Sequence, residues 1–169
     1  MMPNKNTDIS DISDISHISI RPAVPTDAAA ITACVNAAYA KWIPIIGQTP
    51  GPMLADYAAV IKTEAVFVAE QVRANVARFA GVLVLSRTDE GFLLDNIAVQ
   101  PDFAGLGVGK ALLLLAEAQA AAGGYDSIYL YTHEKMTENI ALYAKNGYVE
   151  YARREEHGFK RVFMRKTLA

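Results

Sequence analysis

Residues 94–111 of this chain read LDNIAVQPDFAGLGVGKA. The apolar stretch that ends at Val99 predicts a strand, and a run of helix-forming residues begins after a loop with Gly105, Gly107 and Gly109. Glycines at alternate positions free the backbone, so that successive N–H groups can turn toward one anion at the start of the helix. A tight turn with glycines for packing alone seldom needs three. The segment therefore predicts a phosphate-binding loop.

Two well-known nucleotide loops do not fit this segment. A P-loop has a glycine five residues before its Gly-Lys pair and a Ser or Thr after that pair. Ala104 and Ala111 stand at these two places here. A dinucleotide-binding loop has its third glycine where this chain has Lys110, and it belongs to a β-α-β unit rather than to a series of strands. Neither ATP nor a dinucleotide is the expected ligand.

The composition limits the classes of protein to consider. A chain of 169 residues with 52% hydrophobic residues is long enough and apolar enough for one domain with a substantial core. Its formal net charge of −2 provides no basic surface for nucleic acid. Cys34 is the single cysteine, and with three histidines it argues against a disulfide or a structural zinc site. Because the longest apolar runs, 79–85 and 111–122, are too short to span a membrane, we expect a cytoplasmic protein.

The remaining sequence predicts a tail and one domain. Residues 1–16 contain three copies of Asp-Ile-Ser, and a period of three fits neither a helix nor a strand. We expect a flexible low-complexity tail there, with an assembly tag as the alternative, and a single domain over 17–169. Strands are predicted over 18–21, 65–70, 79–87, 92–99, 127–132, 148–154 and 160–166.

Helices are predicted from a Thr26 cap to about Trp42, from Met53 to about Lys62, over 107–122, and from a Thr137 cap to Asn146. Prolines and glycines predict a loop over 43–52. The order of elements predicts an α/β fold, in which a mixed central sheet of about seven strands is flanked by about four helices.

The glycine segment resembles the coenzyme A loop of the GCN5-related N-acetyltransferase (GNAT) family. That pattern has Arg or Gln, two residues, Gly, one residue and Gly or Ala, after a strand that ends in Val-x-Pro. The match runs through Val99, Pro101, Gly107 and Gly109, and it departs at Ala104, where Arg or Gln would stand. The resemblance implies that acetyl-CoA is the co-substrate, without a metal, and that a loop backbone holds its pyrophosphate. The implied residues are Gly105, Leu106, Gly107, Val108, Gly109, Lys110 and Ala111, with backbone groups of Ile97, Ala98 and Val99 at the acetyl carbonyl and pantetheine.

A second resemblance lies in residues 140–148, IALYAKNGY, which are similar to the family's helix of Leu-Tyr followed by Gly and an aromatic residue. Tyr143 falls on the tyrosine that acts as general acid in the family, while a packed core tyrosine is the alternative. Where the family often has an asparagine for the pantetheine arm this chain has Met136, so Asn139, one turn later, is the candidate contact. The two motifs together extend the resemblance over residues 18–168.

The general base is less defined by the sequence. Asp95 precedes the cofactor loop, and strict strand alternation would place it on the same face as Leu93 and Ile97, where burial would raise its pKa. A structural hydrogen-bonded aspartate is the alternative. Other candidates are Tyr131, His133, Glu134 and a chain of water molecules.

These observations together predict an N-acetyltransferase that moves an acetyl group from acetyl-CoA to a primary amine. A non-catalytic acyl-CoA-binding module and the use of another acyl-CoA are the alternatives. The acceptor, a small molecule or a peptide, is not defined by the sequence. Tyr39, Trp42 and Tyr57 fall on the helices that wall the acceptor cleft in the family, where substrate contact and packing are equally expected. The resemblance is also compatible with a homodimer.

Overall fold

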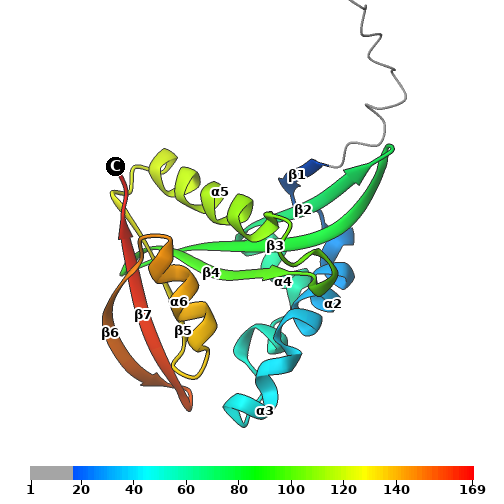
Figure 1. Cartoon of the computed structure of the whole chain (residues 1–169). Coiled ribbons are helices and arrows are strands. Elements are labelled where there is room, and N and C mark those ends of the chain that lie inside the picture. The colour runs from blue at the N-terminus through cyan, green and yellow to red at the C-terminus, as the bar shows by residue number, and fades with distance from the viewer. Residues whose placement is uncertain (1–16) are drawn as a thin grey trace, which may run out of the picture.

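The computed structural model describes residues 17–169, so the tail predicted over residues 1–16 lies outside the described residues. Seven strands form one sheet in the order β1-β2-β3-β4-β5-β7-β6 (Figure 1). The neighbouring strands are antiparallel, except for β4 and β5, which run parallel. The strands are β1 (His17–Pro22), β2 (Ala65–Arg73), β3 (Val76–Thr88), β4 (Gly91–Val99), β5 (Ser127–His133), β6 (Val149–Glu156) and β7 (Phe159–Thr167). The predicted mixed sheet and α/β fold are confirmed.

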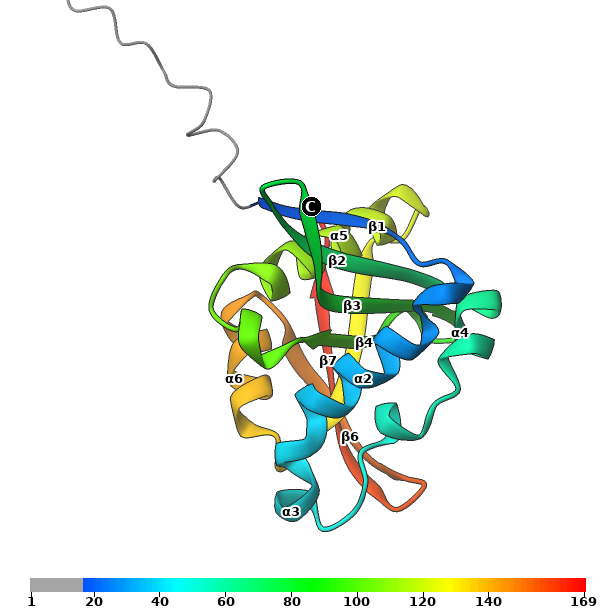
Figure 2. The ribbon, with the colours of Figure 1, turned by 90° about the vertical axis from the view of Figure 1, so that its right-hand side faces the viewer.

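Helices cover both faces of this sheet (Figure 2). Helices α5 (Val108–Ala122) and α6 (Thr137–Lys145) lie on one face, and α2 (Ala28–Tyr39) and α4 (Tyr57–Thr63) lie on the other. Shorter elements connect α2 to α4, namely the turn η2 (Ala40–Trp42), the short helix α3 (Ile43–Ile46) and the turn η3 (Gly51–Leu54). Turns η1 (Pro25–Asp27) and η4 (Pro101–Phe103) precede α2 and α5.

The hydrophobic core is divided by the sheet into two layers. Fully buried Leu112 and Ala116 of α5 pack with Leu83 of β3 in the layer that α5 and α6 cover. On the opposite face, Ile31 and Val35 of α2 pack against strands β2, β3 and β4. Alternate residues of each central strand enter alternate layers, as the strand period requires. This division fixes α5 on one side of β4 and α2 on the other.

Several helix boundaries differ from the sequence prediction. Thr26 does not cap α2, which begins at Ala28, because Pro25–Asp27 forms a 3₁₀ turn in which the Asp27 carboxylate accepts a hydrogen bond from the amide of Val24. Helical structure continues through α3, so the loop predicted from residue 43 starts only at Gly47. Trp42 and Ile46 of this extension are buried against Met136, which holds the helical turns in place.

The starts of α4 and α6 also differ from the sequence prediction. Helix α4 begins at Tyr57 rather than at Met53, because the Asp56 side chain accepts hydrogen bonds from the next turn's amides and so caps the helix. Met136, not Thr137, is the residue before α6. The predicted end of α6 is confirmed, because Gly147 has a φ of 94° and stops the helix in a left-handed conformation.

The continuous helical run Pro25–Ile46 has 22 residues and a mean hydropathy of 1.3, which by length and composition alone would suffice to cross a membrane. In the structure one side of this run belongs to the core, where Ile31, Cys34 and Val35 have no exposed surface. These three residues pack against strands β2, β3 and β4.

Candidate active site

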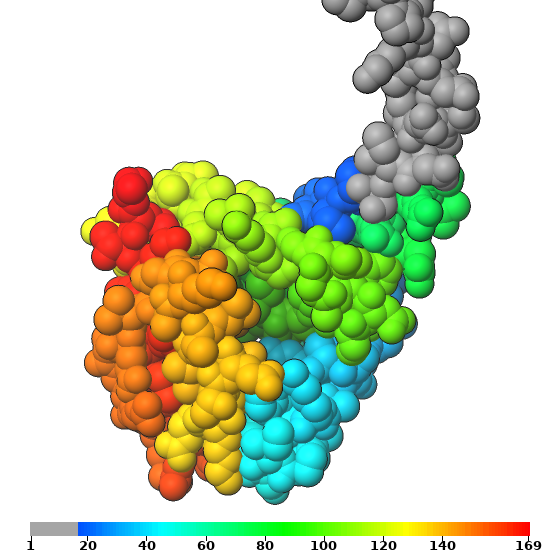
Figure 3. Space-filling model, in the orientation of Figure 1, coloured from blue at the N-terminus to red at the C-terminus, as the bar shows by residue number. Residues whose placement is uncertain are grey.

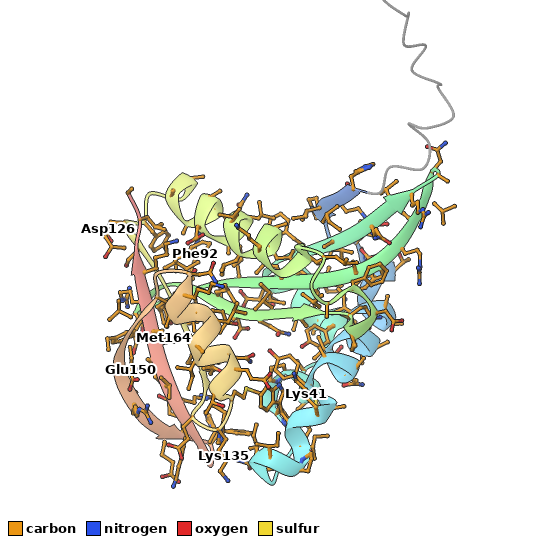
Figure 4. The ribbon with its side chains drawn as sticks, in the orientation of Figure 1. Lys41, Phe92, Asp126, Lys135, Glu150 and Met164 are labelled. Carbon is orange, nitrogen blue, oxygen red and sulfur yellow. The ribbon has the colours of Figure 1, made fainter. Side chains whose placement is uncertain are left out.

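Strands β4 and β5 separate soon after they begin. They pair only at Phe92 with Ile128 and at Leu93 with Tyr129, and they then diverge toward the glycine loop (Figure 1). Phe92, labelled in Figure 4, marks the paired end. Because a parallel ladder stops there, the backbone of the later residues of β4 has no strand partner on the β5 side. The separation opens a space in the middle of the sheet.

The backbone of Ile97 and Val99 faces this opening. The amide of Gln100 donates to the carbonyl of Ala80 over 2.8 Å, which places Gln100 in a hydrogen-bonded pair with β3. Hydrogen-bonded pairs alternate along an antiparallel ladder. Ala98 therefore also bonds to β3, whereas the N–H and C=O groups of Ile97 and Val99 point the other way. Ala98 contributes neither its backbone nor its side chain, which packs against α2, to the opening.

A β-bulge turns two successive polar residues of β4 to the same face. Leu94 pairs with Leu85 and Asn96 pairs with Val84, so Asp95 is an extra residue without a partner in β3. Asp95 and Asn96 consequently both face the side of α2 and α4, together with Leu93. Ile97 packs on the opposite face, in the layer of α5. The expectation that Asp95 shares a face with Ile97 is wrong, because alternation is interrupted at the bulge.

The loop between β4 and α5 has the conformation of an anion-binding site. Gly105 and Gly107 have φ values of 77° and 85°, and Gly107 forms the N-terminal boundary of α5. Within residues 17–169, no acceptor takes a hydrogen bond from the amides of Gly105 through Lys110. These amides also lie at the positive end of the α5 dipole. Phe103 is buried and anchors the loop, whereas Ala104 is exposed and offers no polar side chain.

Tyr143 lies on α6, on the face of the sheet that α5 also covers. Its ring is buried and packs edge-on against Tyr148, with ring centroids 5.8 Å apart. Burial raises the pKa of Tyr143 to about 12, so the hydroxyl is protonated at neutral pH. Tyr143 belongs to the same core layer as Phe103 and Val108, which flank the glycine loop.

Asn139 and Met136 form a separate group at the start of α6. The Asn139 side chain is half-buried and points to the sulfur of Met136, with Nδ2 3.7 Å from Sδ. Met136 itself is buried against Trp42 and Ile46. Lys41 on η2 and Glu138 on α6 form an ion pair at 3.4 Å across the same gap. Figure 4 labels Lys41 and Lys135, which lie on these two facing segments.

A cavity of about 280 Å³ occupies the α2 side of the opening, and we refer to it as the central cavity. Segments of α2 to α4, β4, β5 and β7 enclose it. Its polar lining is Tyr39, Tyr57, Asp95, Asn96, Tyr131, Thr132, His133 and Arg161, and its apolar lining includes Ile46, Pro52, Val60, Val84, Met136 and Phe159. Figure 3 shows the surface hollowed where the orange α6 segment, the green loop before α5 and the cyan α2–α3 segment meet.

Asp95 is the carboxylate of the central cavity. Its side chain reaches solvent through the cavity, yet protein surrounds it on the other sides, and this desolvation raises the pKa of Asp95 above 3.8. Glu64 raises that pKa further, whereas a hydrogen bond from Tyr131 and the charge of Arg161 act in the opposite direction. A carboxylate with a raised pKa is a stronger proton acceptor than one with the usual pKa.

The other base candidates are less well arranged. Burial lowers the pKa of His133, so this ring is neutral at pH 7, and its Nδ1 accepts a hydrogen bond from the amide of Lys135 over 3.1 Å. The proton then resides on Nε2, and no lone pair is left for an incoming proton. Burial raises the pKa of Tyr131, which keeps that phenol protonated. Glu134 lies outside the cavity lining, 3.9 Å from Arg153.

The sequence motifs do not single out Asn96, whereas Tyr39 and Tyr57 are expected as either substrate contacts or packing residues. Asn96 is buried on β4, where it joins Tyr39 and Tyr57 through hydrogen bonds. Two polar residues in succession within an otherwise apolar strand are the sequence signal of the bulge, and they could have identified Asn96. Trp42 packs against Met136 and is not part of the cavity lining.

Comparison with known proteins agrees with this geometry. A family model described as the acetyltransferase (GNAT) domain matches residues 62–150, which is more than half of the chain and includes β4 and the glycine loop. The chain belongs to the GNAT acetyltransferase family. A search of curated protein sequences gave no match.

Solved structures show that the whole fold is shared. A GCN5-related N-acetyltransferase from Rhodopseudomonas palustris superposes with a TM-score of 0.71 at 25% identity, over 89% of this chain and 95% of that chain. The ribosomal-protein-S18-alanine N-acetyltransferase from Escherichia coli gives a TM-score of 0.69 at 20% identity, over 90% and 95% of the two chains. The PaiA N-acetyltransferase from Thermoplasma acidophilum, solved with coenzyme A, gives 0.65 at 19% identity, over 89% and 99%. This GNAT chain therefore has the complete family fold.

Proposed function

We propose that this GNAT chain transfers the acetyl group of acetyl-CoA to a primary amine by direct attack. The observation that carries the proposal is the separation of β4 from β5 after Leu93 and Tyr129. It leaves the amides of Ile97 and Val99 unpaired between an anion-binding loop and a cavity with a carboxylate. A thioester in the opening would thus meet backbone donors on one side and an amine on the other.

The amides of the glycine loop are the groups proposed to hold the pyrophosphate of acetyl-CoA. Gly105 through Lys110 supply unpaired N–H groups, and the N-terminus of α5 adds its dipole. The coenzyme A complex of the Thermoplasma protein supports coenzyme A as a ligand of this fold. Ala104 supplies no side-chain contact, so binding would depend on the backbone.

Attack of the amine nitrogen forms a bond to the thioester carbon, and negative charge develops on the carbonyl oxygen. An amide of Ile97 or Val99 would donate to this oxyanion, a contribution of about 3–4 kcal/mol where such donors have been removed in other enzymes. The carbon–sulfur bond then breaks, and the electron pair leaves on the thiolate. The amine loses its proton to Asp95, directly or through water.

Tyr143 is the proposed donor of a proton to the thiolate. Its pKa of about 12 ensures that the proton is available at neutral pH. A free thiol has a pKa of ~8.5, and the difference from the pKa of Tyr143 corresponds to about 5 kcal/mol that opposes the proton transfer. The same burial would raise the pKa of the departing thiol, which narrows that gap.

Release of free thiol from acetyl-CoA tests this function. Protein with acetyl-CoA and a panel of small amines and peptide N-termini should release thiol in proportion to an N-acetylated product detected by mass spectrometry. The same panel with propanoyl-CoA and succinyl-CoA tests whether another acyl group is preferred. Tight coenzyme A binding with no acyl transfer to any amine would favour a binding module instead.

A further inference from the structure

A chain of three hydrogen bonds crosses the floor of the central cavity. The hydroxyl of Tyr57 donates to the carbonyl of Pro52 over 2.6 Å. Nδ2 of Asn96 donates to the Tyr57 hydroxyl oxygen over 3.0 Å, and the hydroxyl of Tyr39 donates to Oδ1 of Asn96 over 2.9 Å. The chain links η3, α4, β4 and α2, and all three side chains line the cavity.

The carbonyl of Pro52 fixes the direction of every bond in this chain. A carbonyl can only accept, so the single proton of Tyr57 is directed to it. The Tyr57 oxygen then accepts from the NH₂ group of Asn96, which turns the amide oxygen of Asn96 toward Tyr39. The Tyr39 hydroxyl must therefore donate its own proton to that oxygen. The Tyr39 hydroxyl therefore has only lone pairs to offer to a ligand in the cavity.

The Tyr39 oxygen shares the lining of the cavity with the carboxylate of Asp95. Burial raises the pKa of the Tyr39 hydroxyl, and nearby Tyr143 and Asp95 raise it further, so the hydroxyl keeps its proton. An ionised carboxylate and an oxygen with only lone pairs are satisfied together by a group that carries several N–H donors. A primary amine or ammonium group is such a group, whereas a hydroxyl can donate only once.

The rest of the cavity is suited to a compact ligand. Ile46, Val60, Met136 and Phe159 provide apolar walls. Nε2 of Gln48 donates to the carbonyl of Gly158 over 2.9 Å, and this bond joins the segment before η3 to the turn between β6 and β7. The volume of about 280 Å³ also suits a small amine better than a longer peptide.

We propose that the central cavity binds a compact primary amine with an apolar or aromatic body, and that the Tyr39 oxygen accepts a hydrogen bond from its amine. Asn96 and Tyr57 are positioning residues, because they hold the Tyr39 proton away from the ligand. The inference rests on the proposed acetyl transfer, for which it names the class of acceptor.

Calorimetric titration of the coenzyme A-saturated protein tests this inference with three probes. They are 2-phenylethylamine, 2-phenylethanol with the same body and no amine, and trialanine amide as a peptide N-terminus. The proteins are the wild type, Tyr39→Phe, Tyr57→Phe and the control Tyr151→Phe. Tyr151 also has a hydrogen-bonded hydroxyl, to Glu90 over 2.9 Å, but it lies outside the cavity lining.

We expect the wild type and Tyr151→Phe to bind the amine at least about tenfold more tightly than the alcohol. Tyr39→Phe should lose most of this preference, and Tyr57→Phe should lose part of it, because Asn96 can then turn and release the Tyr39 proton. Loss of packing alone would weaken both probes equally. If Tyr39→Phe does not fold, the preference measured for Tyr57→Phe decides the matter.

Three results would overturn the inference. They are equal binding of amine and alcohol by the wild type, an unchanged preference in both cavity variants, and tighter binding of trialanine amide than of 2-phenylethylamine. Coenzyme A affinity, measured first for each protein, reports separately on the proposed function. If the wild type does not bind coenzyme A, the proposed acetyl transfer is contradicted, whatever the amine titrations show.

Discussion

Asp95 and Asn96 are consecutive residues of β4, yet both side chains face the central cavity. The bulge at Asp95 makes this possible, because it inserts one residue between the partners of Leu85 and Val84. Asn96 organises the hydrogen bonds of the floor, while Asp95 remains available to a ligand. The bulge thus places a structural amide and a cavity-lining carboxylate side by side.

The role of Asp95 as base predicts a pH dependence of activity. Because the pKa of Asp95 is raised above 3.8, kcat/KM of the wild type should fall as the pH is lowered through that higher pKa. Asp95→Asn should reduce kcat/KM at pH 7 by about 10²-fold and remove this acidic limb. Initial rates of thiol release between pH 4.5 and 9 would measure both effects. An unchanged limb in the variant would assign the base to another group.

Asp95 also predicts a pH-dependent cost in stability. A carboxyl with a raised pKa in the folded state binds its proton more tightly than in the unfolded state, so folding is disfavoured as the pH rises through the interval between the two pKa values. Asp95→Asn should therefore raise Tm relative to the wild type above this interval, and less so below it. Thermal unfolding at pH 4 and pH 8 measures the difference. A larger gain at pH 4 would contradict the raised pKa.

The cofactor loop predicts a sharp effect of one methyl group. Gly107 has a φ of 85°, so Gly107→Ala strains the left-handed turn by about 1 kcal/mol and displaces the amides that precede α5. We expect at least a tenfold loss of coenzyme A affinity by calorimetry. Gly124→Ala is a matched control, because Gly124 has a φ of 84° and equally open surroundings at the other end of α5. Equal coenzyme A affinity of Gly107→Ala and Gly124→Ala would show that the glycine loop does not bind coenzyme A.

The assignment of Tyr143 predicts a loss of turnover without a loss of binding. Tyr143→Phe should lower kcat by about 10²-fold and leave coenzyme A affinity within about twofold. Its neighbour provides the control, since the Tyr148 hydroxyl is buried without a hydrogen-bond partner among the described residues. Tyr148→Phe should keep kcat and should not lower Tm. Similar kcat values for both variants would make Tyr143 a packing residue.

The contact between β3 and the cofactor loop predicts a stability effect. A Cβ on Gly81 would lie 2.9 Å from the carbonyl oxygen of Ala98 and 3.1 Å from Cγ1 of Val108. Gly81→Ala should therefore cost about 1–3 kcal/mol in urea denaturation. Gly51→Ala, which meets no atom within 4 Å, should change stability by less than about 0.5 kcal/mol. Equal stability of the two variants would show that β4 and α5 can move apart easily.

The centre of the sheet could be predicted from the sequence because β2, β3 and β4 are rich in apolar residues and are separated by short polar turns. The loop could be predicted because Gly105 and Gly107 stand where the backbone has positive φ values. Helix starts were predicted less well. Asp27 forms ion pairs with Arg21 and bonds its own turn, and Asp56 caps α4, so tertiary and local hydrogen bonds decided the boundaries.

The central cavity could not be predicted in detail, because it depends on contacts between distant segments. Tyr39 and Asn96 are 57 residues apart in the chain, and their hydrogen bond exists only because α2 packs on β4. The face of Asp95 depends on a bulge that interrupts the strand period. The lack of a free lone pair on His133 follows from one backbone amide, that of Lys135. A pattern of residue types records none of these contacts.

The central claim is that the glycine loop and the open edge of β4 hold acetyl-CoA. Thermal unfolding with acetyl-CoA, coenzyme A, ATP and NAD, each at the same concentration, tests it most directly. The account predicts that acetyl-CoA and coenzyme A alone raise Tm, by a stabilisation of about 2.7 kcal/mol at 100 times Kd. A shift with ATP or NAD alone, or no shift with either coenzyme A species, would contradict it.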